Sequence, residues 1–244
     1  MARRAPFPAA LKNYESVIAD DLRQFLETML LALAALLPIV NPLGGAPIFL
    51  AKTADLTSGE HDDLARRVAV NCFILLLVST FIGAYVLDFF GLSIPAVQVA
   101  GGAVVCAMGW NLLNEPESPR TAARDAARAN TPTDLARRAF YPLTMPLTVG
   151  PGSIAIAVTL GANPPQQVRR LILTFGAHVV GILIVALSVY LCYRYAERIL
   201  RRLGATGTIV LTRLSAFILL CIGVQICWNG LHVLLGSALR GTGS

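Results

Sequence analysis

The sequence predicts an all-α polytopic membrane protein with six transmembrane helices arranged as a 3+3 inverted repeat, in which helices 1 and 4 are broken. Three observations predict this fold class: the composition, a series of apolar stretches, and a proline–glycine motif that occurs twice. The 244-residue chain is 55% hydrophobic and only 14% charged, with a mean hydropathy of +0.65. A soluble domain is usually about a quarter charged, so the polar residues here must be confined to short connections.

Six apolar stretches account for most of the chain, and a helix needs about 20 mostly apolar residues to cross a bilayer. They lie near residues 25–51, 67–90, 94–114, 140–162, 169–193 and 209–235. The longest polar connection separates two halves of three stretches each. We therefore expect five regions: an N-terminal amphipathic extension (1–22), a first repeat (23–114), a polar central loop (115–139), a second repeat (140–235) and a C-terminal tail (236–244).

The distribution of basic residues predicts the orientation of these helices. Thirteen of the 20 Lys and Arg residues fall in or beside the first, third and fifth connections, and seven fall on the opposite side. Cytoplasmic loops carry an excess of Lys and Arg. We therefore expect a multi-pass protein of the inner (plasma) membrane with its central loop in the cytoplasm and both termini outside.

The repeated motif lies in the first and fourth stretches, at an offset of 104 residues. Three prolines in each stretch align: Pro38, Pro42 and Pro47 with Pro142, Pro146 and Pro151. Since each half contains an odd number of spans, the second half would enter the membrane from the opposite side. Secondary transporters are commonly built from such inverted repeats, and their interrupted helices mark the substrate site.

The motif predicts an interruption in each of the two helices. A proline inside a helix removes a backbone donor and clashes with the preceding turn, and in hydrocarbon the freed backbone groups must be satisfied by protein or water. The two interruptions should therefore face each other inside the bundle. We expect Pro47 and Pro151 each to open a new helical segment, whose first amides would attract a substrate carboxylate. The alternative is that the prolines only kink helices for packing.

The candidate substrate-binding residues are those of the two motifs. They are Asn41, Pro42, Gly44, Gly45 and Pro47 in the first motif, and Thr144, Pro146, Thr148, Gly150, Pro151, Gly152 and Ser153 in the second. His178 and Gln225 are polar residues within other spans and are candidates for the solute path or a proton relay. For both, an ordinary packing role is the competing interpretation.

Other functional classes lack a sequence signal. The chain has no P-loop, HExxH or G-x-S-x-G motif, so we expect it not to be an enzyme. The five cysteines lie in or beside apolar runs without a CxxC pair, which predicts no metal site and no cofactor. Basic and aromatic residues are not interleaved, so nucleic acid is not an expected partner. The expected partners are the lipid bilayer and a small solute, and the sequence leaves open whether copies of the chain associate.

The two motifs resemble those of the MarC family. The resemblance rests on NPLGGAPIF (residues 41–49), AFYPLTMPLTVGPGSI (139–154) and the closing segment 213–230, and it extends over roughly residues 25–235. It implies a six-span inner-membrane protein related to LysE-type exporters. It further implies transport of small neutral amino acids such as glycine and alanine, by alternating access between the two broken helices.

Two other functions remain open at this point. A channel-like pore for a small solute would pass it without saturation. A non-transporting membrane scaffold or regulator would use the same segments to bind a partner. The substrate, the coupling ion and the direction of transport cannot be read from the sequence.

Overall fold

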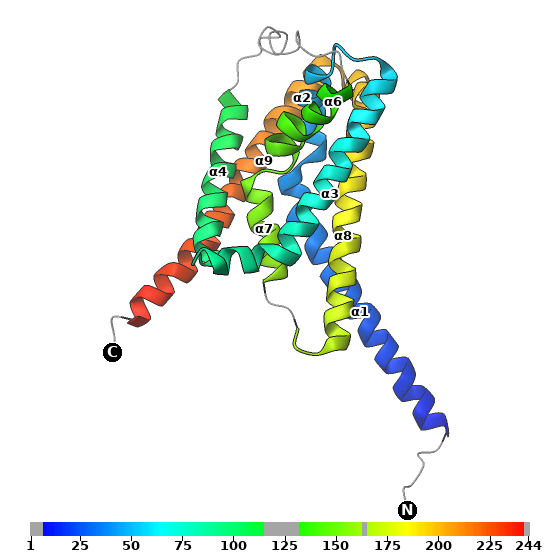
Figure 1. The fold of residues 1–244 in the computed structure, drawn as a ribbon, viewed down its shortest axis with the longest axis vertical. Coiled ribbons are helices and arrows are strands. Elements are labelled where there is room, and N and C mark those ends of the chain that lie inside the picture. The colour runs from blue at the N-terminus through cyan, green and yellow to red at the C-terminus, as the bar shows by residue number, and fades with distance from the viewer. Residues whose placement is uncertain (1–6, 115–131, 163–164, 242–244) are drawn as a thin grey trace, which may run out of the picture.

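The computed structural model describes residues 7–114, 132–162 and 165–241, and none of these lies in a β-strand. Helices therefore build the whole described fold (Figure 1). In chain order the elements are α1 (Phe7–Val40), α2 (Pro42–Lys52), α3 (Ser58–Phe89), α4 (Ile94–Asn114), α6 (Pro132–Arg138), the π-helical segment η1 (Ala139–Thr148), α7 (Pro151–Gly161), α8 (Val168–Arg194) and α9 (Ala196–Gly241).

Five helices in the described part of the chain are long and apolar enough to cross a membrane. These spans are Val17–Lys52, Ser58–Phe89, Ile94–Asn114, Val168–Arg194 and Thr206–Ser237. The stretch expected as the fourth span (140–162) is instead divided into η1 and the shorter apolar helix α7. In Figure 1, α1 begins and α9 ends at the same end of the bundle, while α4 ends and α6 begins at the other end.

The two terminal helices extend beyond the boundaries expected from hydropathy. The part of the N-terminal extension that the structure describes continues without interruption into the first span, because α1 runs from Phe7 to Val40. At the other end, α9 continues to Gly241, past the expected start of the tail. The positive φ of Gly204 (69°) interrupts α9 near its start, ahead of the span that begins at Thr206. Residues 1–6, 115–131 and 242–244 of the expected extension, central loop and tail lie outside the described residues.

The first expected interruption is present at Asn41, but the helix that follows it does not begin at Pro47. Asn41 adopts the left-handed conformation (φ 46°, ψ 61°), and its side-chain oxygen accepts a hydrogen bond from the Gly44 amide at 3.1 Å. Pro42 therefore opens α2, and Pro47 lies inside that helix. The prediction for Pro47 was wrong because asparagine tolerates the left-handed conformation and also caps a helix. The helix start therefore falls directly after Asn41, and Pro42 meets the preference of proline for the first helical position.

The second expected interruption lies between η1 and α7, and here α7 begins at Pro151 as predicted. Gly150 precedes it in an extended conformation, and Met145 departs from helical geometry within η1. Hydroxyl groups satisfy carbonyls in this irregular segment: Thr144 donates to the Ala139 carbonyl at 2.6 Å, and Thr148 donates to the Leu143 carbonyl at 2.7 Å. These bonds satisfy two of the carbonyls that the irregular backbone would otherwise leave unpaired inside the membrane.

Helix α4 packs against α9 in an antiparallel crossing built on glycines. A Cβ atom added to Gly102 would lie 2.6 Å from the amide nitrogen of Cys227, and one added to Gly223 would lie 2.6 Å from that of Cys106. Further along α4, Gly109 faces Leu220, an earlier residue of α9. The two backbones thus touch through small residues, as is common in membrane helix pairs.

A half-buried ion pair joins the connection after α2 to the end of α6. The Arg138 guanidinium donates to the Asp55 carboxylate at 3.0 Å, with the side chains 18% and 31% exposed. Asp55→Asn, Arg138→Gln and the double variant should show a coupling of about 1 kcal/mol in thermal unfolding. The same cycle on Arg23 and Glu27, a pair that is 78% and 64% exposed, should give a clearly smaller coupling, because solvent screens exposed ion pairs. Equal couplings in the two cycles would contradict this difference.

Candidate functional site: a cavity between two interrupted helices

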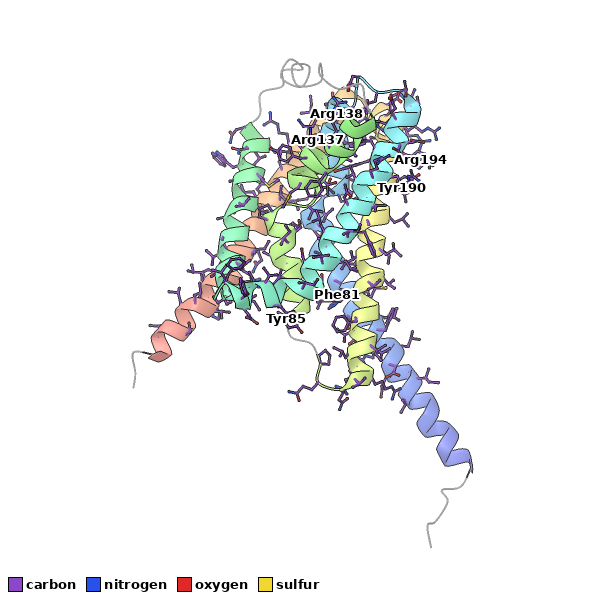
Figure 2. All side chains as sticks on the ribbon, in the orientation of Figure 1. Phe81, Tyr85, Arg137, Arg138, Tyr190 and Arg194 are labelled. Carbon is purple, nitrogen blue, oxygen red and sulfur yellow. The ribbon has the colours of Figure 1, made fainter. Side chains whose placement is uncertain are left out.

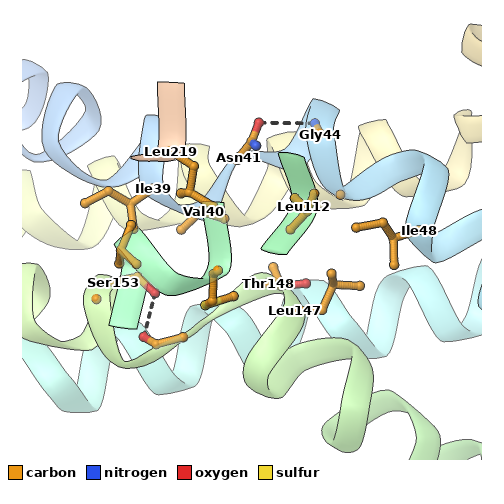
Figure 3. Close-up of a pocket in the computed structure, with 15 residues that line it drawn as sticks. Ile39, Val40, Asn41, Gly44, Ile48, Leu112, Leu147, Thr148, Ser153 and Leu219 are labelled. Carbon is orange, nitrogen blue, oxygen red and sulfur yellow. Dashed lines mark hydrogen bonds between the residues drawn. The ribbon is translucent and has the colours of Figure 1, made fainter. Parts of the chain in front are cut away.

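The two interruptions line one cavity of about 50 Å³ (Figure 3). The first contributes Asn41, Gly44 and Gly45, and the second contributes Thr148, Gly150, Gly152 and Ser153. A cavity needs a volume of roughly 10–15 Å³, measured in the same way, to hold one water molecule. The cavity therefore has room for a few water molecules or for a solute of a few heavy atoms.

The second interruption presents the start of α7 to the cavity. Gly150 has no side chain with which to cap α7, and Pro151 has no N–H. The first amide of α7 that bonds within this turn is that of Ile154, which donates to the Gly150 carbonyl at 3.1 Å. The amides of Gly152 and Ser153 are thus the free donors expected at a helix N-terminus. The Ser153 hydroxyl donates to the Gly150 carbonyl at 2.9 Å (Figure 3).

The first interruption is less open to a ligand, because its own side chain caps α2. The Asn41 side-chain oxygen already accepts from the Gly44 amide, and the Gly45 amide donates to the Asn41 carbonyl at 3.0 Å. Asn41 nevertheless lines the cavity, and its side-chain NH₂ group remains a donor. The two helix starts therefore differ: the start of α7 offers backbone amides, and the start of α2 offers a side-chain amide.

The remaining lining is apolar and comes from several helices. It consists of Ile39, Val40, Ile48, Val105, Met108, Leu112, Leu147 and Leu219. No side chain among the described lining residues is charged. Polar donors within an apolar wall suit a solute that is small and has no net charge, because hydrogen bonds are stronger where water is excluded.

Several predicted residues of the two motifs are not among those that line the cavity. Thr144 is fully buried and its hydroxyl accepts from Asn71 at 3.4 Å, while Pro42 and Pro151 occupy the first positions of α2 and α7. Pro47 lies within α2, and the side chain of Pro146 is outside the described part of the structure.

The two other candidates are placed elsewhere in the bundle. His178 is buried in α8, and Gln225 is exposed on α9, where its amide donates to Asn229 at 2.9 Å. Neither residue lines the cavity between the two interruptions. The interpretation of His178 and Gln225 as path or relay residues stays a prediction.

Tyr193 in α8 is a residue that the sequence analysis did not identify. It is fully buried, and its hydroxyl lies 2.9 Å from the Thr148 hydroxyl. Its ring stacks on Phe49 of α2 with centroids 4.5 Å apart. No motif marks this tyrosine. Tyr193 lies near the C-terminal end of an apolar span, where tyrosines are common because they favour the membrane interface. Its presence there therefore does not point to a functional role.

Comparison with known proteins finds one family and relatives that carry its name. A family model described as "MarC family integral membrane protein" matches residues 26–235. A protein of Salmonella paratyphi A named "UPF0056 inner membrane protein MarC" is 33% identical over 210 residues, covering 82% of this chain and 92% of that protein. Its namesake in Escherichia coli O1:K1 / APEC is 31% identical over 211 residues with the same coverage. No solved structure gives a significant match.

Proposed function

Because this chain belongs to the MarC family and is an integral inner-membrane protein, we propose that it is a secondary transporter of small neutral amino acids. It would work by alternating access and would be a carrier, not an enzyme. The observation that carries the proposal is the cavity between the two interruptions, with the free amides of Gly152 and Ser153 on one wall and Asn41 on the other.

The chemistry of the cavity favours a zwitterionic amino acid. The carboxylate would accept hydrogen bonds at the start of α7, where the helix dipole also favours negative charge. With no charged side chain in the lining, a basic or acidic side chain on the solute would lie unpaired in an apolar wall, which is costly. The volume of about 50 Å³ favours the smallest members of the class, glycine and alanine.

We further propose that the two halves form an inverted repeat. The reciprocal contacts of Gly102 and Gly223 support this, because two equivalent helices that cross antiparallel are what an in-plane two-fold axis would produce. The cytoplasmic side would be the end at which α4 finishes and α6 begins. Figure 2 shows Arg137, Arg138 and Arg194 gathered at that end, as the positive-inside rule requires.

The test is a counterflow assay with radiolabelled glycine and alanine in proteoliposomes. The wild-type protein should show saturable exchange. Gly150→Leu should reduce it at least about tenfold, because the leucine side chain would fill much of the cavity. Gly150 has a φ of −95°, which leucine adopts without strain. Gly236→Leu is the matched control, since a Cβ atom at Gly236 meets nothing within 4 Å, and it should leave exchange unchanged.

The same assay distinguishes the other two functions. Flux that rises linearly with solute concentration, without stimulation by solute on the opposite side, would indicate a channel. Absence of exchange from well-inserted wild-type protein would remove glycine and alanine as substrates. If Gly150→Leu then changed the binding of a partner protein, a scaffold role would be favoured.

A further inference from the structure

The Tyr193 hydroxyl in α8 lies against residues of both interrupted segments, Thr148 and Gly45. Its hydroxyl is 2.9 Å from the Thr148 hydroxyl, and the Thr148 hydroxyl lies 2.7 Å from the Leu143 carbonyl. A carbonyl only accepts, so the single hydrogen of Thr148 points to Leu143. Tyr193 must therefore be the donor to Thr148, and its hydrogen bond reaches the second interruption.

The same hydroxyl also contacts the first interruption. A Cβ atom added to Gly45 would lie 2.5 Å from the Tyr193 hydroxyl oxygen and 3.3 Å from the two nearest ring carbons. Only glycine lets the backbone of α2 approach this closely. Gly45 and Thr148 both line the cavity, whereas Tyr193 does not. The hydroxyl oxygen of Tyr193 therefore contacts one lining residue from each interruption.

The ring of Tyr193 is held firmly in this position. It stacks on Phe49 with an interplanar angle of 15°, and Phe49 packs edge-on against His61 at 4.9 Å between centroids. Tyr193 and Phe49 are both fully buried. Because Phe49 belongs to α2, the stacking holds α8 against the helix that follows the first interruption. The hydrogen bond from the Tyr193 hydroxyl to Thr148 holds α8 against the second interruption.

We propose that Tyr193 is a positioning residue that sets the separation of the two interruptions and thereby the largest side chain that the solute can carry. This inference rests on the proposed transport function and adds a determinant of solute size to it. Without the hydroxyl, the wall at Thr148 is no longer tied to α8. The cavity can then widen, which weakens the fit of glycine and admits larger neutral amino acids.

The experiment compares Tyr193→Phe, Gly45→Ala and the double variant, with Tyr85→Phe as the control because Tyr85 is an exposed tyrosine on α3. For Tyr193→Phe we expect the KM of glycine counterflow to rise roughly 3- to 10-fold, as for the loss of one hydrogen bond, with kcat nearly unchanged. Unlabelled valine should compete with glycine better than it does in the wild type. Tyr85→Phe should change neither value.

The Gly45→Ala variant tests the contact itself and needs no transport. Its methyl group would displace the Tyr193 hydroxyl, so thermal unfolding in detergent should occur about 4–10 °C lower. In the double variant the 2.5 Å clash with the hydroxyl oxygen is gone and only the 3.3 Å contacts with the ring carbons remain. The melting temperature should therefore lie above the value that the sum of the two single losses gives. Additive losses in the double variant would overturn the tie between Tyr193 and the first interruption.

The two readouts separate this inference from the transport function. If wild-type protein exchanges glycine but Tyr193→Phe leaves its KM and the valine competition unchanged, Tyr193 is a core aromatic and the inference fails while the transporter stands. If the wild type exchanges neither glycine nor alanine, the proposed function fails together with the size limit. In that case the unfolding measurements test only the contact between Tyr193 and Gly45.

Discussion

Alanine in place of Gly102 is expected to destabilise the protein by about 2–3 kcal/mol, and alanine in place of Gly223 should do the same. In each case the added methyl group would lie within 3 Å of backbone atoms of the partner helix. Overpacking usually costs roughly 1–3 kcal/mol and occasionally more. Because backbone atoms in a helix cannot turn away, we expect a cost of about 3–4 kcal/mol here. The gain in helix propensity, at most about 1 kcal/mol, offsets only part of this cost.

The measurement is thermal unfolding in detergent, where we expect both variants to melt about 5–10 °C below the wild type. Gly236→Ala in the same helix α9 is the control, because its Cβ atom would have open space around it. It should be neutral or slightly stabilising. Because the contacts of the two glycines are reciprocal, both substitutions should be destabilising. If only one of them lowered the melting temperature, the helices would not meet through both glycines.

Asn41→Ala is expected to cost about 2–3 kcal/mol and to abolish glycine exchange. The loss has two parts: the cap on the Gly44 amide, worth about 1 kcal/mol, and the left-handed backbone of Asn41, which costs a residue such as alanine about 1–2 kcal/mol. Without either, α1 and α2 would tend to close the interruption or to shift it. The start of α2 would then leave its place in the cavity wall.

Asn41→Gly separates these two parts. Glycine keeps the left-handed conformation at little cost but has no side chain for the cap or for the solute. We expect its melting temperature to lie between those of the wild type and Asn41→Ala, while exchange is still lost. Full exchange by Asn41→Gly would show that the protein needs the backbone geometry of this residue and not its amide.

The sequence predicted where the helices are interrupted better than how each interruption is built. The aligned prolines located both breaks, and Pro151 does open α7. At the first break, the predicted helix start was Pro47, whereas α2 begins at Pro42. The choice depended on the backbone conformation of Asn41, which the side chain and the surrounding packing determine together.

Tyr193 could not be predicted, for a different reason. It lies 45 residues from Thr148 in the sequence, and nothing local in α8 distinguishes it from other tyrosines near the ends of spans. His178 is a candidate from the sequence because a histidine within a span is uncommon, yet it does not line the cavity. A residue's rarity is visible in one sequence, whereas a contact between distant helices depends on how the whole bundle packs.

The division of the fourth apolar stretch has a consequence for biogenesis. At 1.5 Å per residue, the 11 residues of α7 reach only about 16 Å, roughly half the thickness of the hydrocarbon core. Unsatisfied backbone groups between η1 and α7 would cost several kcal/mol each in lipid. The translocon should therefore not release this stretch into the bilayer as an independent helix. We expect it to integrate only once α3 and α4, the helices that it packs against, are in place to receive it.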